Sequence, residues 1–204
     1  MGSMLYKNLT LTKKIYMTLP IYVILYTIIL KQPLSYLAGT LFIAAYLSSL
    51  TLFGHEEQAK ATTFQKALPV KLSTVIGAYY INLLMVLGYA LILGLIGSHV
   101  RSGIMPEILP PSLAEILLAT ALSLVVSSLQ IPIIIRFGAS KTRVFNLLFL
   151  MAIFALAGLS AHFLGIGSGT TSPFVAPALL GVALLVSLLS YAVSLTMYRK
   201  KEAD

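Results

Sequence analysis

Long apolar runs, each nearly free of charged side chains, make up most of this chain. A membrane-spanning helix needs about 20 mostly apolar residues, because the hydrocarbon core is roughly 30 Å thick and each helical residue rises about 1.5 Å. The runs of this kind predict six spans. They are Ile15–Leu30, Leu34–Phe53, Leu72–Ile96, Leu113–Ile135, Val144–Leu164 and Pro173–Tyr198. The pattern therefore predicts an all-α, polytopic membrane protein whose six-helix transmembrane domain covers residues 15–198.

The segments at the two ends of the chain are short and polar. Residues 1–3 precede a second methionine and look like residues added ahead of the natural start, so they are left out of the fold prediction. Residues 4–14 place two leucines one helical turn apart beside lysines, which predicts a short amphipathic helix at the membrane surface. The alternative for this segment is a basic tail that docks nowhere. Residues 199–204 are expected to form a tail in solution.

Composition supports the membrane assignment and excludes other classes of protein. Hydrophobic residues make up 58% of the chain and charged residues only 10%, whereas soluble domains carry roughly 25% charged residues. The net charge of +8 could signal a nucleic-acid partner. That function needs basic residues gathered on one exposed face, whereas here they stand singly between apolar runs, so we expect no nucleic acid. The absence of cysteine excludes disulfides and thiolate metal sites.

The basic residues also predict the orientation, because Lys and Arg concentrate in the cytoplasmic loops of membrane proteins. Of the 14 Lys and Arg residues, only Lys31 and Arg101 fall on one side of the six runs. The others fall on the opposite side: Lys7, Lys13, Lys14, Lys60, Lys66, Lys71, Arg136, Lys141, Arg143, Arg199, Lys200 and Lys201. We therefore expect a cell-membrane protein with both termini in the cytoplasm, and the even number of spans agrees.

The spans offer few groups that could carry out chemistry. None of the six runs has Lys, Arg or Asp in its interior, which argues against an ion-coupled transporter. His55 and Glu56 begin the H-E-x-x-H pattern of zinc proteases, but Ala59 stands where the second histidine is required. A phosphate-binding Walker loop is absent as well. The chain is therefore expected to hold no catalytic, metal or cofactor site of its own.

Three positions interrupt the apolar pattern inside the spans. Asn82 lies near the middle of the third run, where it either bonds a neighbouring helix or lines a polar path, and we expect the bond. Pro132 lies in the cytoplasmic half of the fourth run, with Gln130 close before it. A proline inside a helix frees a backbone carbonyl and bends the helix. We expect a kink there, with Gln130 available to satisfy the freed backbone groups.

The segment Gly54–Lys71, between the second and third runs, is unusual among the loops because it is both acidic and basic. Its sequence predicts a cytoplasmic helix over residues 55–68. Glu56 and Glu57 would lie in the first turn, where acidic side chains suit the positive end of the helix dipole. Pro69 would then end the helix.

One side of this predicted helix is apolar and must be buried against another surface. Phe64 and Leu68 gather near its end, with Lys66 between them, and their apolar side chains require either lipid or another protein. Docking on lipid headgroups is the alternative to a protein partner. The acidic pair at the start of the helix favours the protein partner, because the anionic inner leaflet would repel it.

This segment resembles part of a known family, the permease subunits of small six-span bacterial and archaeal ABC exporters, which are encoded separately from their ATPase. In that family a Glu-rich stretch follows the second span and leads through a Leu-Pro-Val turn into the third. The matching residues here are Glu56-Glu57, Leu68-Pro69-Val70-Lys71 and Tyr79-Tyr80. The family commonly has Ser-Arg after the valine, whereas this chain has Lys71-Leu72. The resemblance covers the six-span plan, but its specific part runs only from Glu56 to Tyr80.

The resemblance implies that the segment is a coupling helix seated in a groove of the ATPase, with Phe64 and Leu68 as buried anchors. The ATPase-contacting residues would be Glu56, Glu57, Phe64, Lys66, Leu68 and Pro69. It also implies that two permeases, identical or related, work with two ATPase subunits, which bind the ATP. The alternatives are a self-contained membrane channel or carrier, or a non-catalytic membrane scaffold.

Overall fold

The computed structural model describes residues 2–30, 33–58, 71–105, 108–139, 141–142, 148, 151, 155 and 174–203. Five long α-helices account for most of them. They are α1 (Gly2–Ile29), α2 (Pro33–Gln58), α4 (Leu72–Ile104), α5 (Leu113–Phe137) and α7 (Val175–Ala203). The fold is all-α, as predicted. The segment 59–70 lies outside the described ranges, as does the fifth predicted span, Val144–Leu164, apart from residues 148, 151 and 155.

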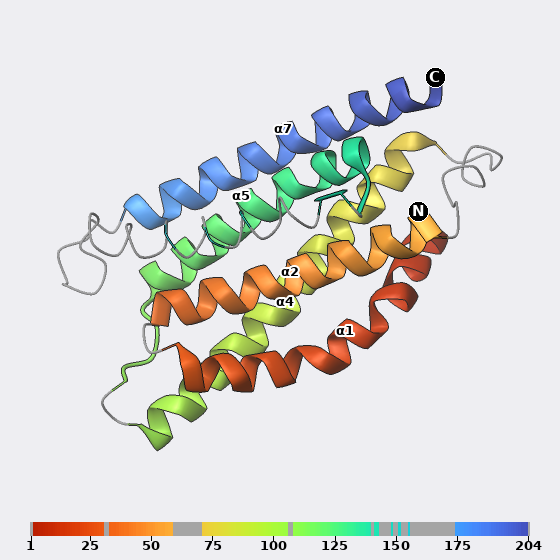
Figure 1. Ribbon diagram of the computed structural model, residues 1–204. Helices are drawn as coiled ribbons and strands as arrows, with labels where there is room; N and C mark the ends of the chain where they lie inside the picture. Colours follow the sequence, from red (N-terminus) through yellow and green to blue (C-terminus); the bar gives the residue numbers. More distant parts are fainter. Residues whose placement is uncertain are drawn as a thin grey trace.

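The five helices form one elongated bundle (Figure 1). α2 packs against α1, α4 and α5, while α5 also packs along α7, and α4 contacts every other described helix. Both chain termini, the end of α2 and the start of α4 lie together at one end of the bundle (Figure 1). We call this the terminal end, and the other the opposite end. The arrangement follows from antiparallel apolar helices that must satisfy their backbone internally in lipid.

Four of these helices, α2, α4, α5 and α7, are long and apolar enough to cross a membrane. α1 is long enough but not apolar enough to count with these four described helices. Its apolar half carries several tyrosines and threonines, and Lys13 and Lys14 lie beside it. Six spans therefore remain a proposal, which rests on α1 and on the undescribed fifth run as the other two.

The first helix differs from expectation. The boundary predicted between residues 14 and 15 is not seen, since α1 is one continuous helix that bends along its length (Figure 1). Its buried residues recur every three or four positions, at Met4, Asn8, Thr12, Ile15, Leu19 and Val23. This stripe crosses the predicted boundary, so the same face of the helix packs on the bundle before and after it. The polar members of the stripe made the first half look like a surface segment.

Pro20 lies inside α1 and cannot donate to the carbonyl of Tyr16, four residues earlier. The Tyr89 hydroxyl of α4 donates to that carbonyl oxygen at 3.1 Å. The Tyr16 and Tyr89 rings also meet edge to face, with centroids 5.1 Å apart. A side chain from a neighbouring helix thus replaces the hydrogen bond that the proline removes.

The third predicted span is also longer than expected. α4 continues past Ile96 to Ile104, so Arg101 lies in its last turn rather than in a loop. Arg101 is buried, with its guanidinium 5.8 Å from the centre of the Tyr36 ring. Gly97 makes this approach possible, because a Cβ there would lie 2.3 Å from the Tyr36 hydroxyl and 3.0 Å from Val23. The predicted span ended at Ile96, whereas the helix passes through Gly97, which provides space for close packing.

The beginnings of α5 and α7 follow local rules. Ser112 and Glu115 form a capping box, in which the Glu115 amide donates to Ser112 Oγ at 3.3 Å and the Ser112 amide donates to the Glu115 carboxylate at 2.7 Å. Pro177 lies in the first turn of α7, where its missing N–H costs no hydrogen bond. Both helices therefore begin where the sequence supplies a suitable residue.

Candidate coupling site at the terminal end

A buried carboxylate joins three helices at the terminal end. Glu56, in the last turn of α2, is only 6% exposed. It forms an ion pair with Lys7 of α1 and accepts a hydrogen bond of 2.6 Å from the Tyr79 hydroxyl of α4. The Tyr79 ring packs against Phe53, one turn before Glu56 on α2, with centroids 4.8 Å apart. We call Lys7, Glu56 and Tyr79 the Glu56 cluster.

The chemistry of a helix end explains why Glu56 needs these partners. The last turn of a helix carries negative partial charge, so an acidic side chain there is unfavourable by itself. Burial adds a desolvation penalty, which an ion pair and a hydrogen bond offset. Lys7 provides the opposite charge and keeps its side chain 35% exposed, so its ammonium group retains contact with water.

The neighbouring residue, Glu57, points to another part of the bundle. Its carboxylate accepts a hydrogen bond of 3.0 Å from the backbone amide of Ala139, just beyond the end of α5. Gly138, which ends α5, has φ of +83°, a conformation that side chains disfavour. A Cβ at Gly138 would also lie 3.3 Å from the Glu57 carboxylate. The positive φ therefore favours glycine at this position, and a Cβ would in addition push the Glu57 carboxylate slightly aside.

Neutral polar side chains continue inward from the Glu56 cluster. The Asn82 amide of α4 donates to Ser48 Oγ of α2 at 3.1 Å, and Thr12 Oγ1 of α1 lies 3.4 Å from Asn82 Oδ1. Of the two alternatives for Asn82, the structure contains the bond to neighbouring helices. Asn8, one turn before Thr12, is buried as well. The three helices are thus connected by polar groups over several turns.

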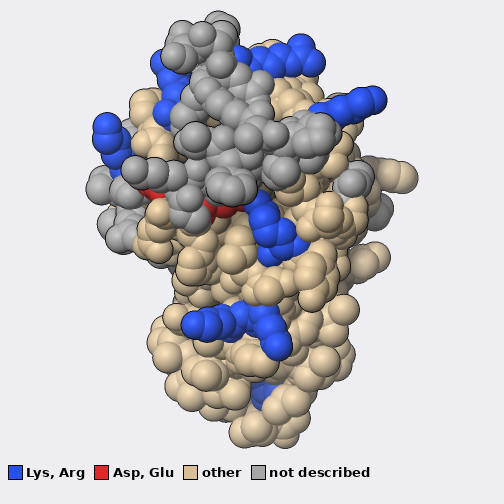
Figure 2. Space-filling model, turned by 90° about the vertical axis from the view of Figure 1, so that its right-hand side faces the viewer, with Lys and Arg blue, Asp and Glu red and all other residues tan. Residues whose placement is uncertain are grey.

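Lys and Arg side chains surround the same end of the bundle (Figure 2). Those whose side chains the structure describes in this half are Lys7, Lys13, Lys14, Lys71, Arg136, Lys141 and Arg199. All except Lys7 are exposed. A basic surface of this kind suits the anionic face of a membrane.

Two of the predicted contact residues occupy a different place from the one expected. Glu56 and Glu57 lie in the last turn of α2, not in the first turn of a separate helix. Gly54 lies between Phe53 and Gln58 but does not end α2, and both carboxylates find partners within the bundle beyond it. The other four, Phe64, Lys66, Leu68 and Pro69, lie outside the described residues.

The partners of Glu56 were missed by sequence reasoning. Lys7 was assigned to a surface segment and Tyr79 to the start of a span. A signal for Lys7 was present, because it adjoins Asn8 in a stripe that continues with helical spacing into the first span. Tyr79 carries no comparable signal, since a tyrosine near a membrane interface is ordinary.

Pro132 of α5 shows how the bundle satisfies a freed carbonyl. The proline cannot donate to Ser128, and Ser190 Oγ of α7 donates to the Ser128 carbonyl oxygen at 2.7 Å. The predicted partner, Gln130, does not fill this role. Its side chain is 1% exposed and forms no hydrogen bond within the described part of the chain. A hydroxyl from the adjoining helix reaches the carbonyl, whereas Gln130 is two residues away on the same helix and projects from a different side.

Comparison with known proteins supports the resemblance described above. A family model described as "ABC-2 family transporter protein" matches residues 3–199, nearly the whole chain. No curated protein and no solved structure showed a significant match. The family match confirms the kinship with ABC transporter permeases first indicated between Glu56 and Tyr80. The chain therefore belongs to the ABC-2 transporter family, as a multi-pass membrane component.

Proposed function

We propose that this protein is the permease subunit of an ABC exporter, driven by a separate ATPase that acts on the segment beyond α2. Family membership supports the proposal, because ABC-2 membrane components imply an ATPase partner. In this proposal the terminal end faces the cytoplasm, with six spans and both termini on that side. The basic surface at the terminal end agrees with such an orientation.

The observation that carries the proposal is the attachment of the last turn of α2. Glu56 bonds to α1 and α4, and Glu57 bonds to the backbone just beyond α5. Gln58 ends α2, and it is followed by segment 59–70, the expected ATPase contact. A displacement of that segment would therefore be transmitted to three other helices, through contacts that are short and charge-assisted. This is a physical route from an ATPase to the transmembrane bundle.

The roles of the predicted residues follow from this geometry. Because Glu56 is buried in the bundle, we assign it to transmission rather than to contact with the ATPase. Phe64 and Leu68 are assigned as apolar anchors in the ATPase groove, as the family resemblance implies. Glu57, Lys66 and Pro69 complete the contact. Two permeases and two ATPases would form the transporter, and spans so poor in charge favour an amphipathic cargo such as a hydrophobic peptide.

The first test is purification in mild detergent from cells that express the chain together with its genomic neighbours. We expect an ATPase with Walker motifs to purify with it in equal amount. A chain that purifies alone and transports after reconstitution alone would overturn the proposal in favour of a self-contained carrier.

The second test examines the contact residues in the assembled complex. Phe64→Asp and Leu68→Asp should uncouple the ATPase, so that its activity no longer responds to the permease, while the permease still folds. Leu109→Asp is the matched control, because Leu109 is an exposed leucine near the opposite end of the bundle. An unchanged ATPase response in both contact variants would contradict the roles assigned to these residues.

A further inference from the structure

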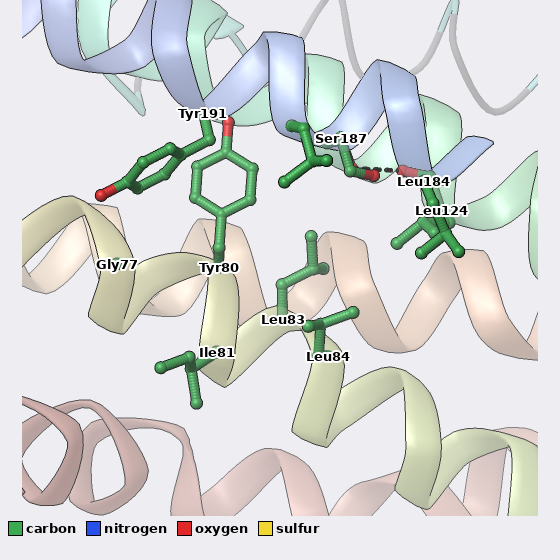
Figure 3. Close-up of a pocket in the computed structure, with 11 residues that line it drawn as sticks. Gly77, Tyr80, Ile81, Leu83, Leu84, Leu124, Leu184, Ser187 and Tyr191 are labelled. Atoms are coloured by element: carbon green, nitrogen blue, oxygen red, sulfur yellow. Dashed lines mark hydrogen bonds between the residues drawn. The ribbon is translucent and has the colours of Figure 1, made fainter. Parts of the chain in front are cut away.

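A groove of about 450 Å³ lies between α4 and α7, with α5 as its floor (Figure 3). Its wall includes Tyr80 and Leu84 of α4, Leu124 of α5, and Leu188 and Tyr191 of α7. Its size lies within the range of sites for small molecules, roughly 300 to 1,000 Å³. The groove belongs to three helices that are each apolar enough to cross the membrane. Its surroundings are therefore hydrocarbon.

The hydroxyl groups beside the groove are already paired with one another. The Tyr80 hydroxyl lies 2.9 Å from Ser190 Oγ and 3.0 Å from Ser194 Oγ. Ser187 Oγ and Ser128 Oγ are 2.7 Å apart (Figure 3). These groups therefore bind helices together rather than offering bonds to a ligand. A molecule bound in the groove would therefore make mainly apolar contacts with its wall, as an acyl chain does.

The groove is accessible from the side of the bundle. Leu84 on one rim is 53% exposed and Leu188 on the other is 65% exposed. Both side chains are large and apolar, which suits contact with lipid tails. A lipid can thus enter laterally without any rearrangement of α4 or α7.

Positive charge lies at the terminal end of the groove. The wall residues of α7 recur with helical spacing, and the stripe Leu184, Leu188, Tyr191 and Leu195 continues to the exposed Arg199. On α4 the first turn has no side-chain cap and follows the exposed Lys71. The Tyr191 hydroxyl donates to the Ser73 carbonyl oxygen at 3.3 Å, which brings this first turn beside α7. Two basic residues and an uncapped helix start therefore lie on the terminal side of the groove, along the two helices that form its walls.

We propose that the groove binds one anionic phospholipid, with an acyl chain between α4 and α7 and its phosphate beside Arg199 and Lys71. The apolar wall accounts for the chain, and the basic residues account for the anionic head, because basic pockets between spans bind such heads. The start of α4 adds favourable backbone N–H groups for a phosphate. The proposal requires a membrane protein, but it does not depend on the proposed coupling to an ATPase.

The chain contains no tryptophan, so a single introduced tryptophan reports on its own surroundings without background. Leu84→Trp places the reporter in the groove. Met85→Trp is the matched control, since Met85 is the next residue, is 43% exposed and does not line the groove. Leu188→Trp and Leu189→Trp form an independent pair on α7. The four variants are reconstituted in phosphatidylcholine vesicles that contain a small fraction of brominated phosphatidylglycerol or brominated phosphatidylcholine.

Bromine quenches tryptophan only at close range. We expect brominated phosphatidylglycerol to quench the groove reporters more strongly than brominated phosphatidylcholine, while the control reporters show no preference. Neutralising Arg199 or Lys71 to Gln should reduce this preference by about fivefold for each charge. Lys13→Gln should leave the preference unchanged, because Lys13 lies on α1, which is not among the helices that line the groove.

Three results would overturn the proposal. Equal quenching by both brominated lipids would mean that the groove takes bulk lipid without selection. Absence of quenching by either lipid at the groove reporters would mean that protein, such as a second copy of the chain, covers the groove. A preference that survives neutralisation of both Arg199 and Lys71 would place the anionic head elsewhere.

Discussion

The two sides of α4 solve the problem of packing polar groups in a membrane in different ways. Towards α1 and α2, α4 contributes Tyr79, which donates a hydrogen bond to the ion-paired Glu56, and Gly97, against which the Tyr36 and Val23 side chains lie closely. Towards α5 and α7, it contributes Tyr80 to a set of neutral hydroxyls and Leu84 to an apolar groove. The first side is tightly packed and charged near the terminal end. The second is looser, and the groups that join its helices are neutral.

The comparison shows where movement is easiest. Neutral hydroxyl bonds between membrane helices are worth about 0.6 kcal/mol on average, whereas breaking a buried ion pair costs several times more. The contact between α4 and α7 should therefore separate first, while α1, α2 and α4 move together. A displacement of the end of α2 by the proposed ATPase would then move α1, α2 and α4 as one unit.

The largest effect should come from reversing one charge of the Glu56 cluster. Lys7→Glu places two carboxylates together, and we expect it to lower the free energy of unfolding by about 3 kcal/mol. The double variant Lys7→Glu with Glu56→Lys should restore most of the loss. Unfolding in a detergent titration measures both. Lys13→Glu, on the exposed face of α1, is the control, and an equal loss there would show that the effect is general surface charge.

The close approach on the same side is tested by Gly97→Ala. Its new methyl group would overlap the Tyr36 hydroxyl, which should lower the free energy of unfolding by about 2 kcal/mol. Gly88→Ala, also in α4, meets no atom within 4 Å and should be neutral or slightly stabilising, because alanine is the better helix former. Thermal unfolding in detergent compares the two. Similar values for both variants would contradict the tight packing of this side.

On the looser side, Ser190→Ala should have a smaller effect, about 1 kcal/mol, because it removes the donor to the Ser128 carbonyl that Pro132 leaves free. In a Pro132→Ala background the same substitution should cost less, since the backbone N–H is restored. This double-mutant cycle isolates the one interaction. Ser194→Ala, which removes only a bond to Tyr80, is the control. Additive effects in the cycle would separate Ser190 from Pro132.

The smallest effect should follow from Tyr89→Phe, about 0.6 kcal/mol, because the ring contact with Tyr16 remains and only one hydrogen bond is lost. Tyr46→Phe is the control, since the Tyr46 hydroxyl has no hydrogen bond among the described residues. The melting temperatures of the two variants in the same detergent give the comparison. Identical melting temperatures for the two variants would indicate that the Tyr16 carbonyl accepts a hydrogen bond from another donor.

Much of the fold was predictable from the sequence because lipid imposes strong rules. Four of the predicted runs correspond to long apolar helices, and the start of α5 follows from Ser112 and Glu115. Helix ends were predicted less well. The helices α2 and α4 continue past the predicted ends Phe53 and Ile96. The predicted spans followed the charge-free runs, whereas the last turns of both helices contain charged residues.

The contacts of the candidate site could not be predicted for a different physical reason. Which residue meets Glu56 depends on the crossing of three helices, and the sequence does not encode that crossing in any short pattern. The same holds for Ser190, which lies 62 residues from its partner Ser128. Gln130 was the obvious local candidate, and the bundle instead used a donor from another helix.

The adjacent positions of Glu56 and Glu57 set a limit on how the length of α2 can change during evolution. Successive residues on a helix point about 100° apart, so one carboxylate faces α1 and α4 while the next faces the end of α5. Inserting or deleting one residue between Pro33 and Gly54 would turn both away from their partners at once. Length variation among relatives should therefore be absent within α2 and begin only after Gln58.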